Sequence, residues 1–261
     1  MTQYDVIIVG AGAAGLMCAA QASQRGRKVL VLDKAIKVGK KILISGGGKC
    51  NFTNLFIESE AYISNNPHFC KSALSRYTQW DFIALLESHH LRWTEKTLGQ
   101  LFCDQKSGAV LRMLLDECQQ VEMVLACDIS QVAFESDYVV QTNQGDFQAK
   151  SLVIATGGPS IPKMGASDFG LQIAKQFGLK SVDFKPALVP LTFHQHDINT
   201  YFKDLSGLSL DAVVACNGAS FREALLITHR GLSGPAILQI SSCWHKRDAI
   251  EINLLPELDS S

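Results

Sequence analysis

The chain lacks the short cysteine spacings that mark metal centres and dithiol redox motifs. Its 261 residues include eight cysteines, and the closest two, Cys118 and Cys127, are nine residues apart. No CxxC occurs, so a zinc ribbon, a thioredoxin-like pair and an adjacent set of iron–sulfur ligands are disfavoured, and we expect no metal. Scattered cysteines are typical of reduced, buried side chains, and we expect a cytoplasmic protein.

The chain also lacks an excess of either charge sign. Lysine and arginine number 24 against 25 acidic residues, a formal net charge of −1. No global field therefore attracts polyanions, and we expect a small-molecule substrate and no nucleic-acid partner. The uncharged run Val6 to Gln24 approaches the length of a membrane span, but three glycines interrupt it and Asp5 precedes it in place of a basic segment. We therefore expect no signal peptide and no membrane anchor.

The first residues carry a dinucleotide-binding pattern. The β-branched run Asp5 to Val9 predicts a buried parallel strand, and a G-x-G-x-x-G sequence follows it at Gly10, Gly12 and Gly15. Gly10 permits a tight turn, Gly12 lets a diphosphate approach the backbone, and Gly15 lets the following helix pack closely on the strand. The N–H groups at the start of that helix favour phosphate, and we expect Ala14 to contact the cofactor there.

A second strand and an acid complete the pattern. Residues 28–32 predict a strand that ends at Asp33, 18 residues beyond Gly15, where a carboxylate is expected to accept the ribose hydroxyls. We expect Lys34 beside it to contact the cofactor as well. A glycine-rich structural turn in another α/β protein is the alternative, but the strand, helix and acid all stand in place.

The later sequence favours FAD over NAD. Short β segments at 124–126, 131–135, 138–142 and 147–149 predict an antiparallel meander, which leads into a buried strand from Ser151 that ends in a glycine turn. A meander within a doubly wound parallel sheet is the layout of the glutathione-reductase type of FAD-binding domain. We therefore expect the cofactor to contact a further set of residues near the strand ends: Ile129, Thr156, Gly157 and Gly158.

The block Gly39 to Asn54, GKKILISGGGKCNFTN, resembles the signature of the BaiN/YhiN-type bacterial flavoproteins. The resemblance continues in residues 157–165, 186–191 and 228–238, and so spans almost the whole chain. It implies an FAD domain interrupted by a β-rich second domain with a helical insertion. It also implies an aminoacetone-oxidase-like oxidoreductase that transfers hydride from NADH or NADPH through FAD to a small organic substrate.

We interpret the block as a loop along the flavin. Small residues let the backbone close on phosphate or on the polar edge of the flavin, and Lys40 and Lys41 are placed to neutralise the diphosphate. The expected contacts of the loop are Ser45, Gly46, Gly47, Gly48, Cys50 and Asn51. The sequence departs from the family at Lys49, where arginine is usual, and at Asp33, where glutamate is usual.

The resemblance also implies a return of the chain to the FAD domain, through a Gly-Asp or Gly-Glu segment near a final helix. The one Gly-Asp, Gly145-Asp146, falls in a hairpin turn. We therefore expect a chain truncated at its C-terminus, with residues 1–185 forming the FAD-binding domain without its return segment and 186–261 forming part of the β-rich second domain. The substrate, the oligomeric state and the choice between NADH and NADPH stay open.

The catalytic residues are the weakest part of the prediction. Cys50 and His229 are the candidates, the first as a flavin-facing thiol and the second as a proton-handling group, and a packing or capping role competes with each. Trp80, Phe82, Leu85 and Leu86 recur at helical spacing and are assigned to the core. The alternatives to an enzyme of small molecules are a non-catalytic nucleotide-binding sensor and, against the near-neutral charge, an RNA-modifying flavoprotein.

Overall fold

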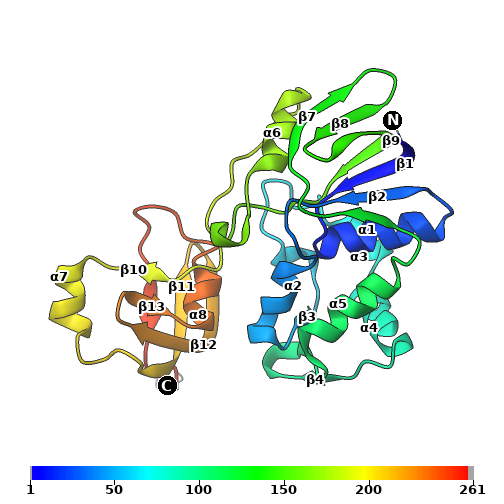
Figure 1. Cartoon of the computed structure of the whole chain (residues 1–261). Coiled ribbons are helices and arrows are strands. Elements are labelled where there is room, and N and C mark those ends of the chain that lie inside the picture. The colour runs from blue at the N-terminus through cyan, green and yellow to red at the C-terminus, as the bar shows by residue number, and fades with distance from the viewer. Residues whose placement is uncertain (1, 258–261) are drawn as a thin grey trace. The chain divides into compact units, whose positions relative to one another are not determined.

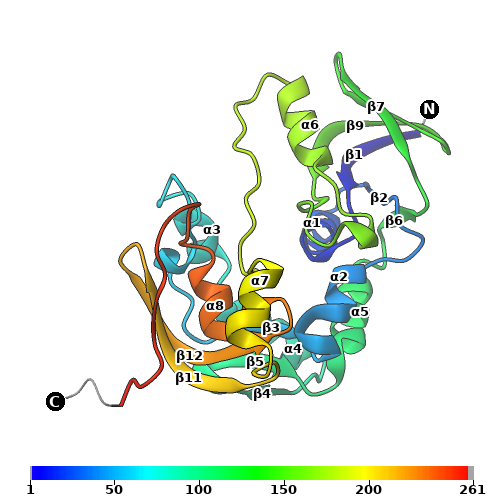
Figure 2. The same ribbon diagram turned by 90° about the vertical axis from the view of Figure 1, so that its left-hand side faces the viewer.

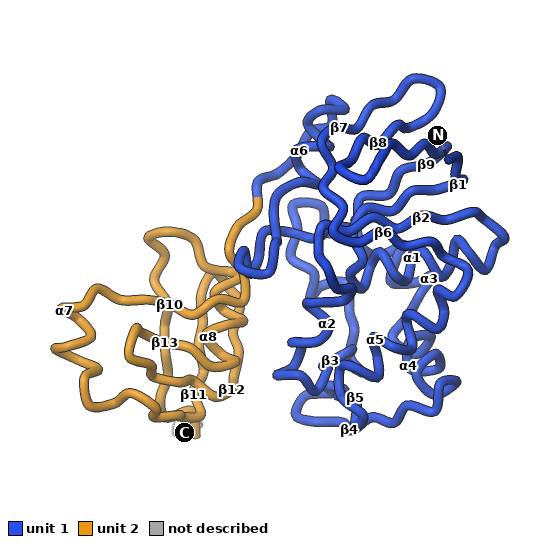
Figure 3. Tube along the Cα trace, viewed as in Figure 1, with its two compact units in different colours: residues 1–183 blue, residues 184–261 orange. Residues whose placement is uncertain are grey.

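The structure is a computed structural model that describes residues 2–257, and the chain divides into two compact units, 1–183 and 184–261 (Figure 3). The boundary that we expect at residue 185 separates an FAD-binding domain from a second domain, and this assignment stays a prediction. The strands of the first unit are β1 Thr2–Val9, β2 Val29–Leu32, β3 Asn51–Asn54, β4 Trp93–Glu95, β5 Gln100–Cys103, β6 Glu122–Val124, β7 Ile129–Phe134, β8 Tyr138–Thr142 and β9 Gly145–Ile154. Its helices are α1 Ala13–Gln24, α2 Lys40–Ile44, α3 Lys71–Arg76, α4 Gln79–Ser88, α5 Lys106–Asp116 and α6 Phe169–Gln176, with short turns η1 Ser45–Gly48, η2 Ser59–Ala61, η3 Thr97–Gly99 and η4 Pro162–Met164.

The main sheet of the first unit has the strand order β6-β2-β1-β9-β8-β7 (Figure 1). Strands β6, β2, β1 and β9 pair in parallel, whereas β8 and β7 continue the sheet as antiparallel neighbours of β9. The predicted class, a parallel α/β sheet with an antiparallel meander, is confirmed.

Both faces of this sheet are covered because successive side chains of β1 point to opposite sides. Val6 and Ile8 pack in one apolar cluster with residues of α1 and α5. Ile7 and Val9 pack in a second cluster, which Phe169 of α6 joins. Since each buried side chain of this size contributes roughly 1.5–3 kcal/mol, the continuous apolar run of β1 fixes the centre of the sheet.

Two details of the predicted meander are wrong. The segment around Val124 is not part of it, because β6 pairs in parallel with β2, with Leu32 opposite Val124. The segments 147–149 and 151–154 are one strand, β9, since β1 pairs with it from Thr2 opposite Phe147 to Val9 opposite Ile154. Pairing along its whole length keeps β9 continuous where the sequence suggested a break.

Between β2 and β6 the chain forms a three-stranded sheet of order β3-β5-β4 together with α3, α4 and α5. Of these elements the sequence indicated only α4, through the helical spacing of Trp80, Phe82, Leu85 and Leu86. Figure 2 shows α2 and α5 side by side at this part of the unit, in keeping with their contacts. In α4, Leu86 is fully buried as expected, but Trp80 is 58% exposed, so its assignment to the core is wrong. Trp80 stands in the first turn of the helix, one turn before the buried Ile83, and helical spacing alone does not show that the helix leaves the core at this end.

The second unit is an antiparallel sheet of order β10-β13-β12-β11-β14, with α8 packed on one face. Its elements are β10 Leu191–Thr192, α7 Gln195–Asp197, η5 Ile198–Phe202, β11 Ser209–Cys216, β12 Ala219–Thr228, β13 Gly231–Ser233, α8 Pro235–Ile240 and β14 Glu251–Asn253. The prediction of a β-rich second part is confirmed. None of the helices in residues 2–257 is long and apolar enough to cross a membrane.

Candidate functional site

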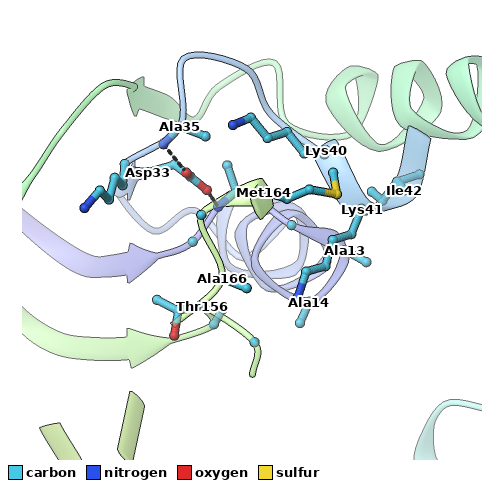
Figure 4. A pocket seen from close by; sticks show the side chains of 18 of the residues that line it. Ala13, Ala14, Asp33, Ala35, Lys40, Lys41, Ile42, Thr156, Met164 and Ala166 are labelled. Atoms are coloured by element: carbon cyan, nitrogen blue, oxygen red, sulfur yellow. Dashed lines mark hydrogen bonds between the residues drawn. The ribbon is translucent and has the colours of Figure 1, made fainter. Parts of the chain in front are cut away.

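A cavity of about 800 Å³ opens in the first unit where β1, β2 and β9 end. Its wall combines the glycine turn after β1, the start of α1, the segment after β2, residues of α2 and β3, and residues 164–167 together with Phe169, the first residue of α6. Figure 4 shows Asp33, Lys40, Thr156 and Met164 arranged around the amino end of α1. The carboxyl ends of the parallel strands meet here, which is the position of ligand crevices in open α/β sheets.

The three glycines of the turn have three different surroundings. Gly10 has a φ of +112°, and a Cβ there would lie 2.5 Å from the backbone oxygen of Ala155. A Cβ on Gly15 would lie 1.8 Å from the oxygen of Gly10, so this glycine brings α1 against the turn and does not line the cavity. At Gly12 a Cβ would meet nothing within 4 Å, and the open space belongs to the cavity.

The start of α1 faces this space, and no side chain accepts hydrogen bonds from its first backbone N–H groups. Gly12 is the N-cap, no side chain caps the helix, and the first turn carries no acid. The leading N–H groups of a helix have no partner within the helix, and they carry a partial positive charge. Gly12 and Ala14 line the cavity, so a phosphate placed there would receive these hydrogen bonds.

Asp33 points into the same region and already holds two backbone groups (Figure 4). Its Oδ2 accepts from Ala11 N at 2.6 Å, and its Oδ1 accepts from Ala35 N at 2.7 Å. An ionised carboxylate has about four acceptor positions, so each oxygen keeps capacity for a hydroxyl donor. The acid therefore fixes the loop after β2 and remains available to a ribose.

Four lysines line the cavity: Lys34, Lys37, Lys40 and Lys41. Lys34 Nζ lies 3.4 Å from Asp128 Oδ1, and Lys41 Nζ donates to the backbone oxygen of Gly158 at 3.3 Å. Asp33 and Asp128 are the acids of the lining, so its formal charge is 4 − 2 = +2. That sum complements a diphosphate.

The block 39–54 is not a loop, which corrects our interpretation. Residues 40–44 form α2, residues 45–48 form η1, and β3 begins at Asn51. Ser45, Cys50 and Asn51 line the cavity, whereas Gly46, Gly47 and Gly48 do not. A Cβ on Gly46 would lie 2.7 Å from the backbone nitrogen of Asn51, so that glycine serves the close turn into β3.

Cys50 is strained and buried. Its φ is +53° and its side chain is 4% exposed. Burial raises the pKa of its thiol, with a hydrogen bond from Ser45 acting in the opposite direction. The thiol is therefore protonated at neutral pH.

At the end of β9, Thr156 provides an unsatisfied polar group. Its Oγ1 is buried and has no hydrogen-bond partner among the described residues, and Thr156 lines the cavity. A buried hydroxyl left without a partner costs about 1–3 kcal/mol, which a polar ligand or water would offset. Gly157 and Ile129 also line the cavity, and Gly158 does not.

The structure adds lining residues that we did not predict. Phe52, Phe82, Val110 and Leu114 form an apolar end, and residues 164–167 cover another side. Phe82 was assigned to the core from its helical spacing, and that spacing cannot show that one edge of a packed side chain meets a cavity. His229 lies exposed in the turn between β12 and β13 of the second unit and does not line this cavity.

These residues fit an adenine dinucleotide such as FAD. The open space above Gly12, the uncapped start of α1, the carboxylate of Asp33 and the lysines suit a diphosphate joined to a ribose. The remaining lining, which includes Cys50, Asn51 and the apolar side chains, would be left for the flavin end of the cofactor.

Comparisons with known proteins agree with this geometry. A family model described as the HI0933-like protein Rossmann domain matches residues 4–233. The chain is 51% identical to a ribosomal RNA dihydrouridine synthase of Escherichia coli (strain K12), over 99% of this chain and 66% of that protein. It is 26% identical to a 3-dehydro-bile acid delta(4,6)-reductase of Clostridium scindens, over 97% of this chain and 65% of that protein.

The chain thus spans just under two thirds of the length of these curated relatives. Among solved structures, the open conformation of a flavocytochrome c3 fumarate reductase matches 80% of this chain and 47% of that chain, with a TM-score of 0.53 and 18% identity. At that identity the likeness shows the fold alone.

Proposed function

The chain belongs to the HI0933-like Rossmann-domain family, and from that premise we propose that it is the FAD-binding part of a flavin-dependent reductase that acts on a uridine of ribosomal RNA. The observation that carries the flavin is the cavity at the amino end of α1, with open space at Gly12 and Asp33 beside it. The observation that favours the substrate is the 51% identity to the Escherichia coli relative.

The residues of the chain would hold FAD along its length. Asp33 would accept the ribose hydroxyls, and the N–H groups of Gly12 and Ala14 would bind the diphosphate together with Lys40 and Lys41. Bound flavin supplies two-electron hydride chemistry, and we propose reduced nicotinamide, NADH or NADPH, as the source of those electrons. The apolar lining of Phe52, Phe82 and Leu114 would exclude water from the far end of the cofactor.

The two named relatives share a reaction type. A dihydrouridine synthase and a delta(4,6)-reductase both saturate carbon–carbon double bonds. In a uracil ring, and in a 3-oxo steroid with double bonds at those positions, the double bond is conjugated with a carbonyl. A reductase of this kind needs a hydride donor on one side of the substrate plane and a proton source near it.

Our expectation of no nucleic-acid partner rested on the net charge of −1. Net charge is a sum over the chain, and it hides the local field of a surface. The lining of the cavity is formally +2, and three of its lysines, Lys34, Lys37 and Lys41, are exposed. The diphosphate of bound FAD would offset this charge, so the support for an RNA substrate is the similarity to the Escherichia coli relative and not the charge of the cavity.

The test measures dihydrouridine in ribosomal RNA. Deletion of the gene in its host should remove dihydrouridine from the ribosomal RNA, measured by mass spectrometry of the digested nucleosides, and re-expression should restore it. Re-expression of Gly12→Glu, which fills the space for the diphosphate, should not restore it. Dihydrouridine that persists unchanged after deletion would exclude this substrate.

A second substrate class is favoured by the Clostridium scindens relative. An unsaturated cyclic ketone would reach the same cavity without any RNA contact, and the near-neutral charge of the chain suits a small molecule. Oxidation of NADH or NADPH that depends on an added enone and on FAD, with no change in ribosomal RNA, would favour this class. Detectable turnover in either assay would exclude a non-catalytic nucleotide sensor.

A further inference from the structure

Two buried cysteines lie beside each other near the cavity, Cys50 directly before β3 and Cys103 at the end of β5. The backbone N–H of Cys103, at the end of β5, donates to the backbone oxygen of Cys50 at 3.2 Å. The adjacent residues Asn51 and Phe102 are partners in the antiparallel pairing of β3 with β5. Cys50 is 4% exposed and Cys103 is 3% exposed, and both belong to the same apolar cluster.

This placement suits a reversible disulfide. Residues that face each other across antiparallel strands have Cβ atoms about 4.5–5.5 Å apart, close to what a disulfide needs. Cys50 and Cys103 extend the pairing of Asn51 with Phe102 by one residue, and the two side chains are near enough to interact electrostatically. Cys50 precedes the first regular residue of β3 and has a positive φ, so its side chain is not fixed by a strand on both sides. The sequence showed only a lone cysteine at position 50, because β5 and the pairing that brings Cys103 to it were not predicted.

The two thiols have different access to the cavity. Cys50 lines it, whereas Cys103 does not and belongs to the same apolar cluster as Cys50. Burial raises the pKa of both thiols, and the approach of a charged Cys50 would raise that of Cys103 further. The pair is therefore a neutral dithiol at physiological pH, with Cys50 in the cavity wall and Cys103 outside it.

We propose that Cys50 and Cys103 are a redox-active dithiol that exchanges two electrons with the flavin, a role that rests on the flavin binding proposed above. In the oxidising direction two S–H bonds break and one Sγ–Sγ bond forms. The two electrons and two protons pass to the oxidised flavin, which is the acceptor. The reverse transfer restores the thiols, so the site stores one electron pair beside the cofactor.

The first experiment needs no cofactor. The 261-residue chain without FAD is treated anaerobically with about one equivalent of diamide, its free thiols are blocked in denaturant, and its peptides are mapped by mass spectrometry. We expect one dominant linked peptide that joins Cys50 to Cys103, and the same link in the Cys118→Ala control, which removes another buried cysteine of the cluster. Absence of this link, or equal yields of unrelated pairs, would overturn the dithiol.

The second experiment counts electrons. The oxidised, FAD-loaded chain is titrated anaerobically with dithionite, and we expect about four electrons per FAD in the wild type and about two in Cys103→Ala. If Cys103→Ala does not fold, Cys50→Ala replaces it. Bound FAD with about two electrons consumed by the wild type would overturn the dithiol alone. A chain that binds no FAD would overturn the proposed function, and electron transfer to the flavin with it.

Discussion

Asp33 accepts a hydrogen bond of 2.6 Å from the backbone N–H of Ala11, and this contact joins the end of β2 to the glycine turn after β1. The same carboxylate accepts from Ala35 N at 2.7 Å, so it also orders the first residues after β2. An acid at this position thus acts before any ligand arrives. It fixes the backbone that forms the floor of the cavity and presents its remaining acceptor positions to that cavity.

Replacing this acid should reduce both stability and cofactor affinity. In Asp33→Ala two backbone N–H groups lose a charged acceptor, which costs roughly 1.5–3 kcal/mol of unfolding free energy per bond at most. Loss of the ribose contact should raise the Kd for FAD by about 10- to 100-fold, measured by flavin fluorescence. Asp5→Ala is the matched control, because Asp5 accepts from Lys28 N outside the cavity. Asp5→Ala should lower stability and leave FAD affinity unchanged. A loss of FAD affinity equal to that of Asp33→Ala would contradict the account.

The glycines of the turn should separate folding from binding. Gly12→Ala places a methyl group in open space at a backbone conformation that alanine can adopt. The free energy of unfolding should therefore change by less than about 1 kcal/mol, while FAD affinity falls at least about tenfold. Gly15→Ala forces a Cβ onto the oxygen of Gly10 and should lower the free energy of unfolding several-fold more than Gly12→Ala does. Chemical denaturation and FAD titration of both variants provide the check. Equal behaviour of the two would show that Gly12 does not face the ligand.

The opening of the chain could be predicted because its signals are local. The apolar run of β1, the glycine turn and Asp33 lie within one short stretch, and each follows from the conformation or burial of neighbouring residues. The pairing of β3 with β5 could not be predicted in this way. It joins Asn51 to Phe102 across a long separation in sequence, and neither short strand has a strong alternating pattern.

The candidate site could likewise be predicted only in part. Gly12, Asp33 and Lys41 line the cavity where the motifs suggested, whereas Gly46 and Gly158 do not. A glycine-rich sequence signals a tight backbone, but it does not tell whether the tightness serves a ligand or a neighbouring strand. The contribution of Phe82 was missed because an amphipathic helix stripe looks alike whether it packs against side chains or borders a cavity.

Lys41 should contribute to FAD binding through its positive charge. Lys41→Gln removes a positive charge near the start of α1 and the contacts of its Nζ with Gly158 and Ser160. We expect a weakening of FAD binding of about three- to tenfold at low ionic strength, with a smaller difference at about 1 M salt because the field is screened. Lys150→Gln, on β9 outside the lining, is the control and should bind FAD as the wild type does. A salt-independent loss would show that charge is not the cause.

The stability of the chain should fall at alkaline pH. Burial raises the pKa of the Cys118 thiol to about 11, and the neighbouring Glu117 adds to this. The pKa of this thiol is higher in the folded chain than in the unfolded chain. Its contribution to the free energy of unfolding is therefore complete below about pH 8.5 and is lost as pH rises toward 11. Urea unfolding at a series of pH values should show this decline, and Cys118→Ala should flatten it. The same slope in Cys118→Ala would assign the decline to other groups.

The most direct test of the cavity is a crystal structure of the 261-residue chain grown with FAD. We predict electron density for the diphosphate at the backbone N–H groups of Gly12 and Ala14, and for the adenosine ribose within hydrogen-bond distance of Asp33. Density for FAD elsewhere, or a cavity that stays empty at saturating FAD, would contradict the assignment of this site.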